Sequence, residues 1–322
     1  MAEPCMTEQG AAVLPAAGRA TAPVSVPVSV PVSVLGQARL AFTVFKPRIA
    51  LEITLTAIAG AAVTPGPGLS AGELLALAVA VFLSAGAAGA YNQVMEQDVD
   101  VRMARTRLRP FVTGRLTPGP LWLVAIAAIV VLAVGLAAAA LNTMVAVQFF
   151  FGDTAYGDIY TSWLKRRTWL NIVLGGLAGS FAALAGSAAV DPTLPAVAWV
   201  FAAALFFWTP PHFWSLAYYN KRDYERAGIP MLPNLLPDRL MAGVILAHTV
   251  VLVALTLLPP LLATGWLYGV CAVIGGAHFI RASITFVRSP TRANALANFH
   301  ASLWQLGLLL AGAIGSGVVA DW

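Results

Sequence analysis

The chain reads GELLALAVAVFLSAGAAGAYNQVMEQDVDVRMARTRLRP from residue 72 to residue 110. Residues 72–95 are predominantly apolar, and a helix of this length crosses the hydrocarbon core of a bilayer. The nineteen residues from Asn92 to Pro110 contain three carboxylates and four arginines. Charge of this density beside a membrane span is costly unless it binds a partner, so the segment predicts a polar site at the end of a membrane helix.

The composition extends the membrane prediction to the whole chain. Of 322 residues, 59% are hydrophobic and 10% are charged, and the mean hydropathy is +0.79. A typical soluble domain has about 25% charged residues. Nine apolar stretches are long enough to span a bilayer, namely residues 40–62, 72–95, 120–139, 141–160, 170–189, 196–218, 240–260, 262–281 and 298–319. We therefore expect an all-α polytopic membrane protein with nine transmembrane helices.

The basic residues predict the orientation of these helices. If the N-terminus is cytoplasmic, all nineteen Lys and Arg residues fall before or at the start of the first helix, or in the loops after helices two, four, six and eight. Cytoplasmic loops of membrane proteins are enriched in Lys and Arg. Membrane orientation thus explains the net charge of +5, and nucleic-acid binding has no support. A bacterial inner membrane is the expected location.

Residues 1–38 differ from the rest of the chain. They contain repeated Pro-Val-Ser units, and the recurring prolines exclude a helix. We expect a disordered or extended tail, followed by one transmembrane domain at residues 39–322. The tail lacks the long apolar core of a secretory signal. Cys5 and Cys271 provide neither a disulfide framework nor metal-ligand spacing.

The charged stretch contains two sets of side chains at fourfold spacing. Asn92, Glu96 and Asp100 lie on one face if they belong to one helix, rising about 6 Å per step. A face of oxygen ligands suits Mg²⁺, which commonly binds carboxylates together with substrate phosphates. Arg105 and Arg109, also four residues apart, are suited to bind those phosphates.

Two further polar segments fall on the same predicted cytoplasmic face. Residues 160–168 follow the fourth span and form a cationic cluster just before Asn171. The sixth span carries His212, and Asp223 lies near its exit. Two acidic clusters that face each other, with cations around them, predict a chamber that binds a diphosphate through metal ions.

These segments resemble the protoheme IX farnesyltransferases, a family of intramembrane prenyltransferases. The family's Asn-x-x-x-Asp-x-x-x-Asp pattern with its Met-x-Arg-Thr-x-x-Arg-Pro continuation is matched at residues 92–110. Its Tyr-Thr-x-x-Leu-Lys-Arg and Asn-Ile-Val-x-Gly-Gly segments are matched at 160–166 and 171–176. Its Pro-His-Phe and Asp-Tyr-x-x-Ala-Gly-Ile-Pro-Met-Leu-Pro signatures are matched at 211–213 and 223–233. The resemblance covers about residues 40 to 320.

The resemblance implies transfer of the farnesyl group of farnesyl diphosphate to a vinyl group of haem b, which gives haem O and pyrophosphate for terminal oxidases. It implies a central cavity open toward the cytoplasmic face and a downstream haem-modifying enzyme or oxidase assembly protein as partner. The implied ligands of Mg²⁺ are Asn92, Glu96, Asp100 and Asp223. The implied diphosphate contacts are Arg105, Arg109, Lys165 and Arg166. His212 is expected in the cavity near the acceptor.

The sequence departs from the family pattern at a few acidic residues. Glu96 stands where the family more often has Asp, and its longer side chain still reaches a metal ion. Asp98 does not replace it, because two residues onward on a helix lies about 200° around the axis. Asp153 and Asp158 lie inside the fourth predicted span, where either cavity lining or an interhelical hydrogen bond would explain them.

Several alternatives remain open. The acceptor of the prenyl group could instead be a quinone precursor or chlorophyllide, since the diphosphate half of the site would be similar. A transporter or assembly factor is less favoured, because the charge gathers on one face and the sequence has no internal repeat. The arginines could contact anionic lipid headgroups instead of substrate. His212 could simply pack between helices, and packing is the expected role of His248, His278 and His300.

Overall fold

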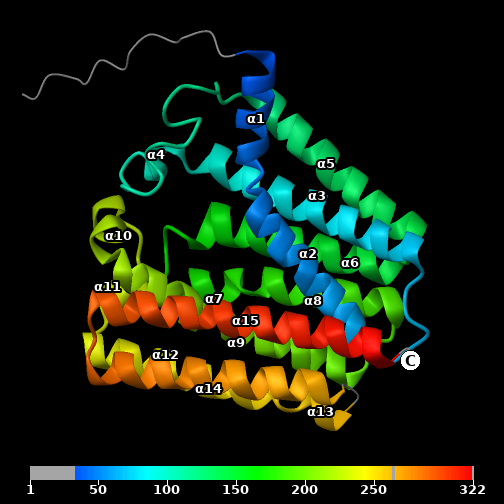
Figure 1. Ribbon diagram of the computed structural model, residues 1–322. Helices are drawn as coiled ribbons and strands as arrows, with labels where there is room; N and C mark the ends of the chain where they lie inside the picture. The colour runs from blue at the N-terminus through cyan, green and yellow to red at the C-terminus, as the bar shows by residue number, and fades with distance from the viewer. Residues whose placement is uncertain (1–32, 263–264, 321–322) are drawn as a thin grey trace, which may run out of the picture.

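The computed structural model describes residues 33–262 and 265–320. Residues 1–32 of the predicted tail lie outside this description, and α1 begins at Val34 rather than at residue 39. The long helices pack side by side as one bundle (Figure 1). The expectation of an all-α protein is therefore confirmed for the described part of the chain.

The helices differ widely in length. In chain order they are α1 (Val34–Val44), α2 (Pro47–Ala62), α3 (Ala71–Met95), α4 (Gln97–Asp100), α5 (Pro120–Ala140), α6 (Thr143–Asp153), the π-helix η1 (Thr154–Leu164), α7 (Asn171–Gly175), α8 (Leu177–Val190), α9 (Ala196–Tyr219), α10 (Lys221–Ala227), α11 (Leu232–Leu235), α12 (Asp238–Thr256), α13 (Pro259–Leu262), α14 (Trp266–Arg288) and α15 (Arg292–Ala320). The short helices α4, α10 and α11 lie at the same end of the bundle (Figure 1).

Six helical stretches among the described residues are long and apolar enough to cross a membrane. They are Ala71–Met95, Pro120–Ala140, Asn171–Val190, Ala196–Tyr219, Asp238–Leu262 and Trp266–Arg288. The three other stretches predicted as spans are also helical, at α2, at α6 with η1, and at α15. The first of these is short because the chain breaks at Lys46, and the second because it changes from α- to π-helix.

Glycines bring α2 and α8 into direct backbone contact. A Cβ atom on Gly186 would lie 1.7 Å from the carbonyl oxygen of Ala57, and one on Gly60 would lie 2.1 Å from that of Ala183. Small residues allow membrane helices to approach closely and gain van der Waals contact. Both positions therefore require glycine, which fixes the two helices against each other in the middle of the bundle.

Three backbone irregularities occur near the end that carries the short helices. Lys46 has a left-handed conformation, with φ 49° and ψ 56°, directly before Pro47. The chain leaves helical geometry at Glu96, with φ −110° and ψ 17°. The π-helix η1 ends just before Lys165. Such interruptions redirect side chains, and π-helical turns are frequent at functional sites.

Candidate active site

The break at Glu96 corrects one part of the sequence prediction. Asn92 belongs to α3, Glu96 lies between the helices, and Asp100 ends α4, so the three side chains do not lie on one continuous helix. All three are nevertheless buried, with 3%, 2% and 2% of their surfaces exposed. The polar face predicted from their spacing therefore exists, although a bent segment forms it instead of a straight helix.

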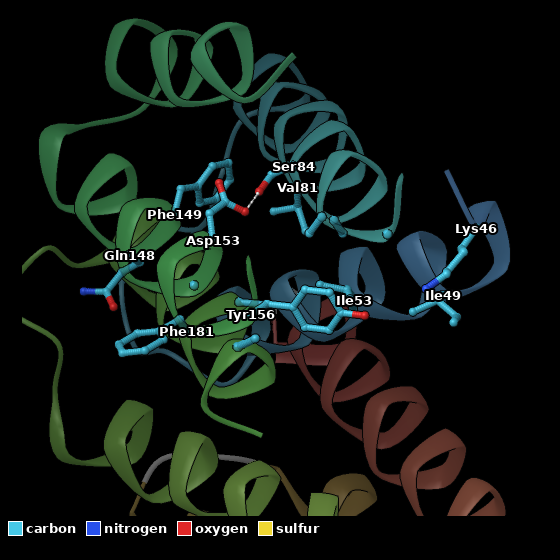
Figure 2. Close-up of a pocket in the computed structure, with 16 residues that line it drawn as sticks. Lys46, Ile49, Ile53, Val81, Ser84, Gln148, Phe149, Asp153, Tyr156 and Phe181 are labelled. Atoms are coloured by element: carbon cyan, nitrogen blue, oxygen red, sulfur yellow. Dashed lines mark hydrogen bonds between the residues drawn. The ribbon is translucent and has the colours of Figure 1, made fainter. Parts of the chain in front are cut away.

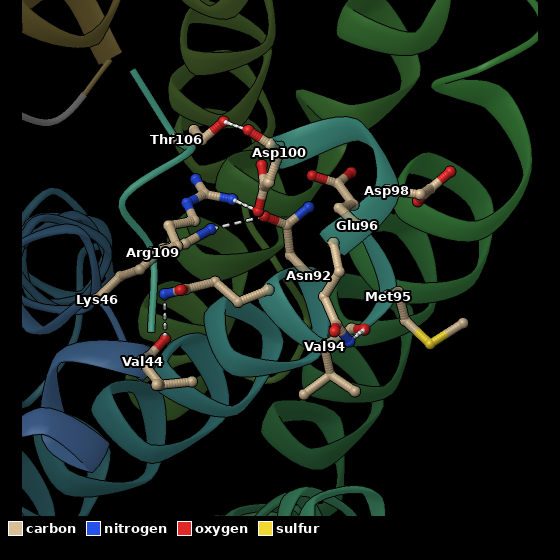
Figure 3. Close-up of polar contacts among 12 residues, drawn as sticks. Val44, Lys46, Asn92, Val94, Met95, Glu96, Asp98, Asp100, Thr106 and Arg109 are labelled. Carbon is tan, nitrogen blue, oxygen red and sulfur yellow. Dashed lines mark hydrogen bonds and ion pairs between the residues drawn. The ribbon is translucent and has the colours of Figure 1, made fainter. Parts of the chain in front are cut away.

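Each of these three side chains contacts a cation from a different part of the chain, and Figure 3 shows the contacts of Asn92 and Asp100. The contacts are Lys46 Nζ to Asn92 Oδ1 at 2.7 Å, Lys165 Nζ to Glu96 Oε1 and Oε2 at 2.6 and 2.5 Å, and Arg109 Nη1 to Asp100 Oδ2 at 2.5 Å. We call these six residues the charged cluster. Two of the contacts, Lys165–Glu96 and Arg109–Asp100, are ion pairs, and this pairing offsets the cost of several kcal/mol of burying each charge alone.

Arg166 points away from the charged cluster, unlike its neighbour Lys165. Its guanidinium donates two hydrogen bonds of 2.7 Å to the carboxylate of Asp98. These hydrogen bonds lower the pKa of Asp98. Both side chains are about half exposed, at 47% and 54%. Figure 3 shows Asp98 directed away from Asp100 and Arg109, so this outer pair attaches α4 to the end of η1 without entering the cluster.

Asp223 connects the second acidic segment to the first. It is buried at the start of α10, where its Oδ2 accepts a hydrogen bond of 3.2 Å from the backbone N–H of Ala104. Its Oδ1 accepts a short hydrogen bond from Arg226. Arg105, next to Ala104, is exposed and has no ion pair with any described residue. The 101–109 segment therefore lies between the two acidic motifs, and Arg102 and Arg107 are exposed like Arg105.

The oxygen ligands of this region suit Mg²⁺ in kind but do not form a complete cage. Within residues 33–262 and 265–320, no three His, Cys, Asp or Glu side chains lie close enough together to hold a metal ion by themselves. Mg²⁺ usually binds one or two protein carboxylates and completes its shell with water and substrate phosphate. The buried set of Asn92, Glu96 and Asp100 fits that mode of binding.

Lys46 is the main functional candidate that the sequence prediction missed. It lies inside the apolar stretch predicted as the first span, and a lysine there was a usable signal. The left-handed turn at Lys46 lets its ammonium group reach Asn92 on α3. It is also the polar residue at one end of a pocket, so it joins the charged cluster to an apolar space.

This pocket, which we call the α2–α8 pocket, lies among α2, α3, α6 and α8 (Figure 2). Its walls are mainly apolar side chains and small residues, including Ile53, Val81, Phe149 and Phe181. Figure 2 shows Lys46 on one side and the two phenylalanines away from it. The pocket, with a volume of about 80 Å³, therefore places Lys46 beside apolar walls.

The two unassigned acidic residues of the fourth predicted span separate in the structure. Asp153 lines the α2–α8 pocket and accepts a hydrogen bond of 2.7 Å from Ser84 Oγ. Both possibilities considered from the sequence, cavity lining and an interhelical hydrogen bond, thus apply to this residue. Asp158 lies exposed on η1, so it belongs to neither class.

His212 is held by α15. Its Nδ1 lies 2.8 Å from Ser302 Oγ, and its ring stacks on Trp208 with centroids 4.2 Å apart. The ring of Phe299 lies at a centroid distance of 4.6 Å. His212 is buried, with 8% of its surface exposed, and these contacts are those of a well-packed side chain.

Comparison with known proteins gives consistent results. The sequence model of the UbiA prenyltransferase family matches residues 53–306. A protein named protoheme IX farnesyltransferase 2, from Paramagnetospirillum magneticum, is 51% identical over 268 residues, which cover 83% of this chain and 93% of that protein. A protoheme IX farnesyltransferase from Thermus thermophilus is 39% identical over 269 residues, covering 83% of this chain and 44% of that protein.

Solved structures show the same fold at low sequence identity. Digeranylgeranylglyceryl phosphate synthase superposes with a TM-score of 0.74 at 14% identity, covering 88% of this chain and 99% of that chain. A UbiA homologue from Archaeoglobus fulgidus bound to GPP and Mg²⁺ superposes with a TM-score of 0.62 at 16% identity, covering 86% and 99%.

Proposed function

Because this chain belongs to the UbiA prenyltransferase family, we propose that it transfers the farnesyl group of farnesyl diphosphate to a vinyl group of haem b. The vinyl group attacks C1 of the farnesyl chain as the bond to the diphosphate oxygen breaks. Water then adds to the cation left on the vinyl carbon and loses a proton, so the products are haem O and pyrophosphate. The relatives named protoheme IX farnesyltransferase support this choice of substrates through 51% and 45% identity over most of this chain. The observation that carries the chemistry is the buried charged cluster, which places three cations beside three oxygen ligands.

The three cations provide the diphosphate site. Lys46, Lys165 and Arg109 are each paired with an oxygen ligand, and a diphosphate offers them a stronger acceptor. Arg105 adds a fourth cation from the surface. Fixed positive charge around a leaving group lowers the barrier to its departure, since pyrophosphate leaves with several negative charges. Arg166 contributes indirectly, by holding α4 through Asp98.

The oxygen ligands released by these cations provide the metal site. Asn92, Glu96 and Asp100 would hold Mg²⁺, with Asp223 contributing from α10. When bound, Mg²⁺ neutralises the diphosphate charge as a Lewis acid. Glu96 and Asp100 would then be compensated by the metal ion, and Lys165 and Arg109 would be free to contact the phosphates.

The farnesyl chain would occupy the α2–α8 pocket. The pocket begins at Lys46, so a chain bound there places its diphosphate at the charged cluster. Departure of pyrophosphate leaves an allylic cation, which the apolar walls protect from water until the acceptor attacks. His212, on α9, is proposed on the acceptor side, where its partner Ser302 fixes the orientation of the ring.

The membrane arrangement that we propose has nine spans, with the N-terminus and the charged cluster on the cytoplasmic side of a bacterial inner membrane. Six stretches meet the requirements of length and hydropathy, and α2, α6 with η1, and α15 supply three more helical segments at the predicted positions. The confinement of Lys and Arg to alternate loops supports this orientation. A downstream haem-modifying enzyme or an oxidase assembly protein would receive the product.

Reconstitution with defined substrates tests the proposal. The purified protein, Mg²⁺, farnesyl diphosphate and haem b should yield pyrophosphate and a farnesylated haem, identified by its mass. Formation of pyrophosphate only with a phenolic acceptor or chlorophyllide would move the assignment to another acceptor. Absence of pyrophosphate release under all metal conditions would refute the prenyl-transfer proposal.

A further inference from the structure

A second pocket lies among α7, α9, α11 and α12, whose positions Figure 1 shows. Its volume is about 370 Å³, within the range of about 300–1,000 Å³ that is usual for small-molecule sites. Two indole rings, those of Trp169 and Trp214, line it together with aliphatic side chains and one imidazole, that of His248. We call it the His248 pocket.

The hydrogen bond of His248 selects which ring nitrogen can bind a ligand. Its Nδ1 lies 2.9 Å from the carbonyl oxygen of Val244. A carbonyl only accepts, so Nδ1 carries the proton and the lone pair is on Nε2. Histidines that bind metal ions commonly have this arrangement, in which the other nitrogen donates to a backbone carbonyl. Nε2 has no hydrogen-bond partner among the described residues.

Trp214 provides a second, independent sign of a ligand. Only 1% of its surface is exposed, and its indole N–H has no hydrogen-bond acceptor within residues 33–262 and 265–320. A buried tryptophan usually finds a partner for this group. The ring centroids of Trp214 and His248 are 5.2 Å apart, and both side chains line the same pocket.

We infer that the His248 pocket binds haem b, with His248 Nε2 as a ligand of the iron and the Trp214 N–H as donor to a carboxylate on the edge of the macrocycle. A flat apolar ring with a metal at its centre and carboxylates at its rim satisfies both unpaired groups. The inference rests on the proposed function, of which haem b is the acceptor substrate. It gives His248 a role in binding that substrate, whereas the sequence analysis expected His248 only to pack between helices.

The pocket and the charged cluster share two segments of chain. Residues 165–170 contribute Lys165 to the cluster and Trp169 to the pocket. Residues 223–236 contribute Asp223 next to the cluster and three leucines to the pocket. The amide of Asn171 contacts carbonyl oxygens of both segments, Thr168 at 2.7 Å and Pro230 at 3.4 Å. An acceptor in the His248 pocket therefore borders the segments that bind the prenyl donor.

Absorption spectroscopy of the full-length protein in detergent tests the iron ligand directly. Haem b is titrated into the wild type, His248→Ala and the matched control His278→Ala, in which an exposed histidine of α14 is removed. His248→Ala should lose the imidazole-ligated spectrum and bind haem at least about tenfold more weakly. Added imidazole should restore the spectrum, and His278→Ala should match the wild type.

A second variant and an iron-free ligand separate loss of the iron ligand from loss of the fold. His248→Gln keeps most of the side-chain volume, so it serves if the alanine variant does not fold. Iron-free protoporphyrin IX should bind the wild type and the His248 variants with equal affinity but should bind Trp214→Phe more weakly. An unchanged haem spectrum and affinity in both His248 variants would overturn the inference, even if the wild type makes farnesylated haem. Conversely, a wild type that binds haem through His248 but makes no farnesylated haem would refute the proposed function alone.

Discussion

Replacement of Lys165 by Met is expected to destabilise the protein and remove most of its activity, whereas the same change at Arg166 should do little of either. Lys165 pairs with Glu96 where their side chains are only 14% and 3% exposed. Loss of one partner from a buried pair costs about 3–5 kcal/mol, because the other charge stays buried. Arg166 and Asp98 are 47% and 54% exposed, and exposed pairs contribute about 0–1 kcal/mol.

The loss of activity should likewise be larger for the Lys165 variant than for the Arg166 variant. Lys165 is a proposed diphosphate contact, and removal of one preorganised charge typically lowers kcat by about 10²- to 10³-fold. Arg166 acts through the position of α4, so its loss should lower kcat by less than about tenfold, in line with a barrier change below about 1.4 kcal/mol. Pyrophosphate release and the mass of the haem product measure activity, and thermal unfolding in detergent measures stability.

A double variant separates the two effects. Lys165→Met with Glu96→Gln removes both charges, so the unfolding temperature should recover toward that of the wild type while activity stays lost. Equal loss of activity in the Lys165 and Arg166 single variants would refute the assignment of one residue to the charged cluster and the other to the outer pair. A stable Lys165→Met variant would show instead that Glu96 is not buried as a charge.

Further predictions concern the metal ligands, the α2–α8 pocket and the helix packing. Asp100→Ala should abolish turnover with haem binding retained, whereas Asp98→Ala should stay active; equal turnover would contradict the metal-ligand assignment. Ala182→Phe, which fills part of the pocket beside the farnesyl chain, should raise KM for farnesyl diphosphate more than for geranyl diphosphate; an equal change for both would place the chain elsewhere. Gly186→Ala should lower the unfolding temperature sharply, because its Cβ would meet the Ala57 carbonyl at 1.7 Å, while Gly179→Ala has open space and should be neutral.

The sequence predicted the helical segments well because the bilayer imposes a simple requirement on length and polarity. Each of the nine predicted stretches coincides with helix in its described residues, although only six described stretches are long and apolar enough to cross a membrane. Local irregularities were harder to foresee. Neither the break at Lys46 nor the π-helix before Lys165 follows from hydropathy. The break has a local signal in Pro47, because proline disfavours helical geometry in the residue before it, and Lys46 was missed although this signal was present.

Burial and pairing in the candidate site depended on the tertiary structure as well. The spacing of Asn92 and Asp100 indicated a shared polar face, and both are buried. It could not indicate that each would contact a cation, because those cations come from residues 46 and 109. Likewise, His212 and His248 are both single histidines in apolar helices. Only the structure shows that one bonds Ser302 while the other lines a pocket.

The break in the helix at Glu96 bears on the different contacts of the two neighbouring acidic residues, Glu96 and Asp98. In an unbroken helix, Glu96 and Asp98 would diverge by about 200°, and one of them would face lipid or another helix. Here α3 ends at Met95, and the chain turns into α4 beyond the bundle. Glu96 then faces inward to Lys165, and Asp98 faces outward to Arg166. Because Lys165 and Arg166 are themselves adjacent, the two pairs fasten α4 to η1 from opposite sides. Under the proposed function, the inner pair would release its charges to the substrate, whereas the outer pair would maintain the shape of the segment.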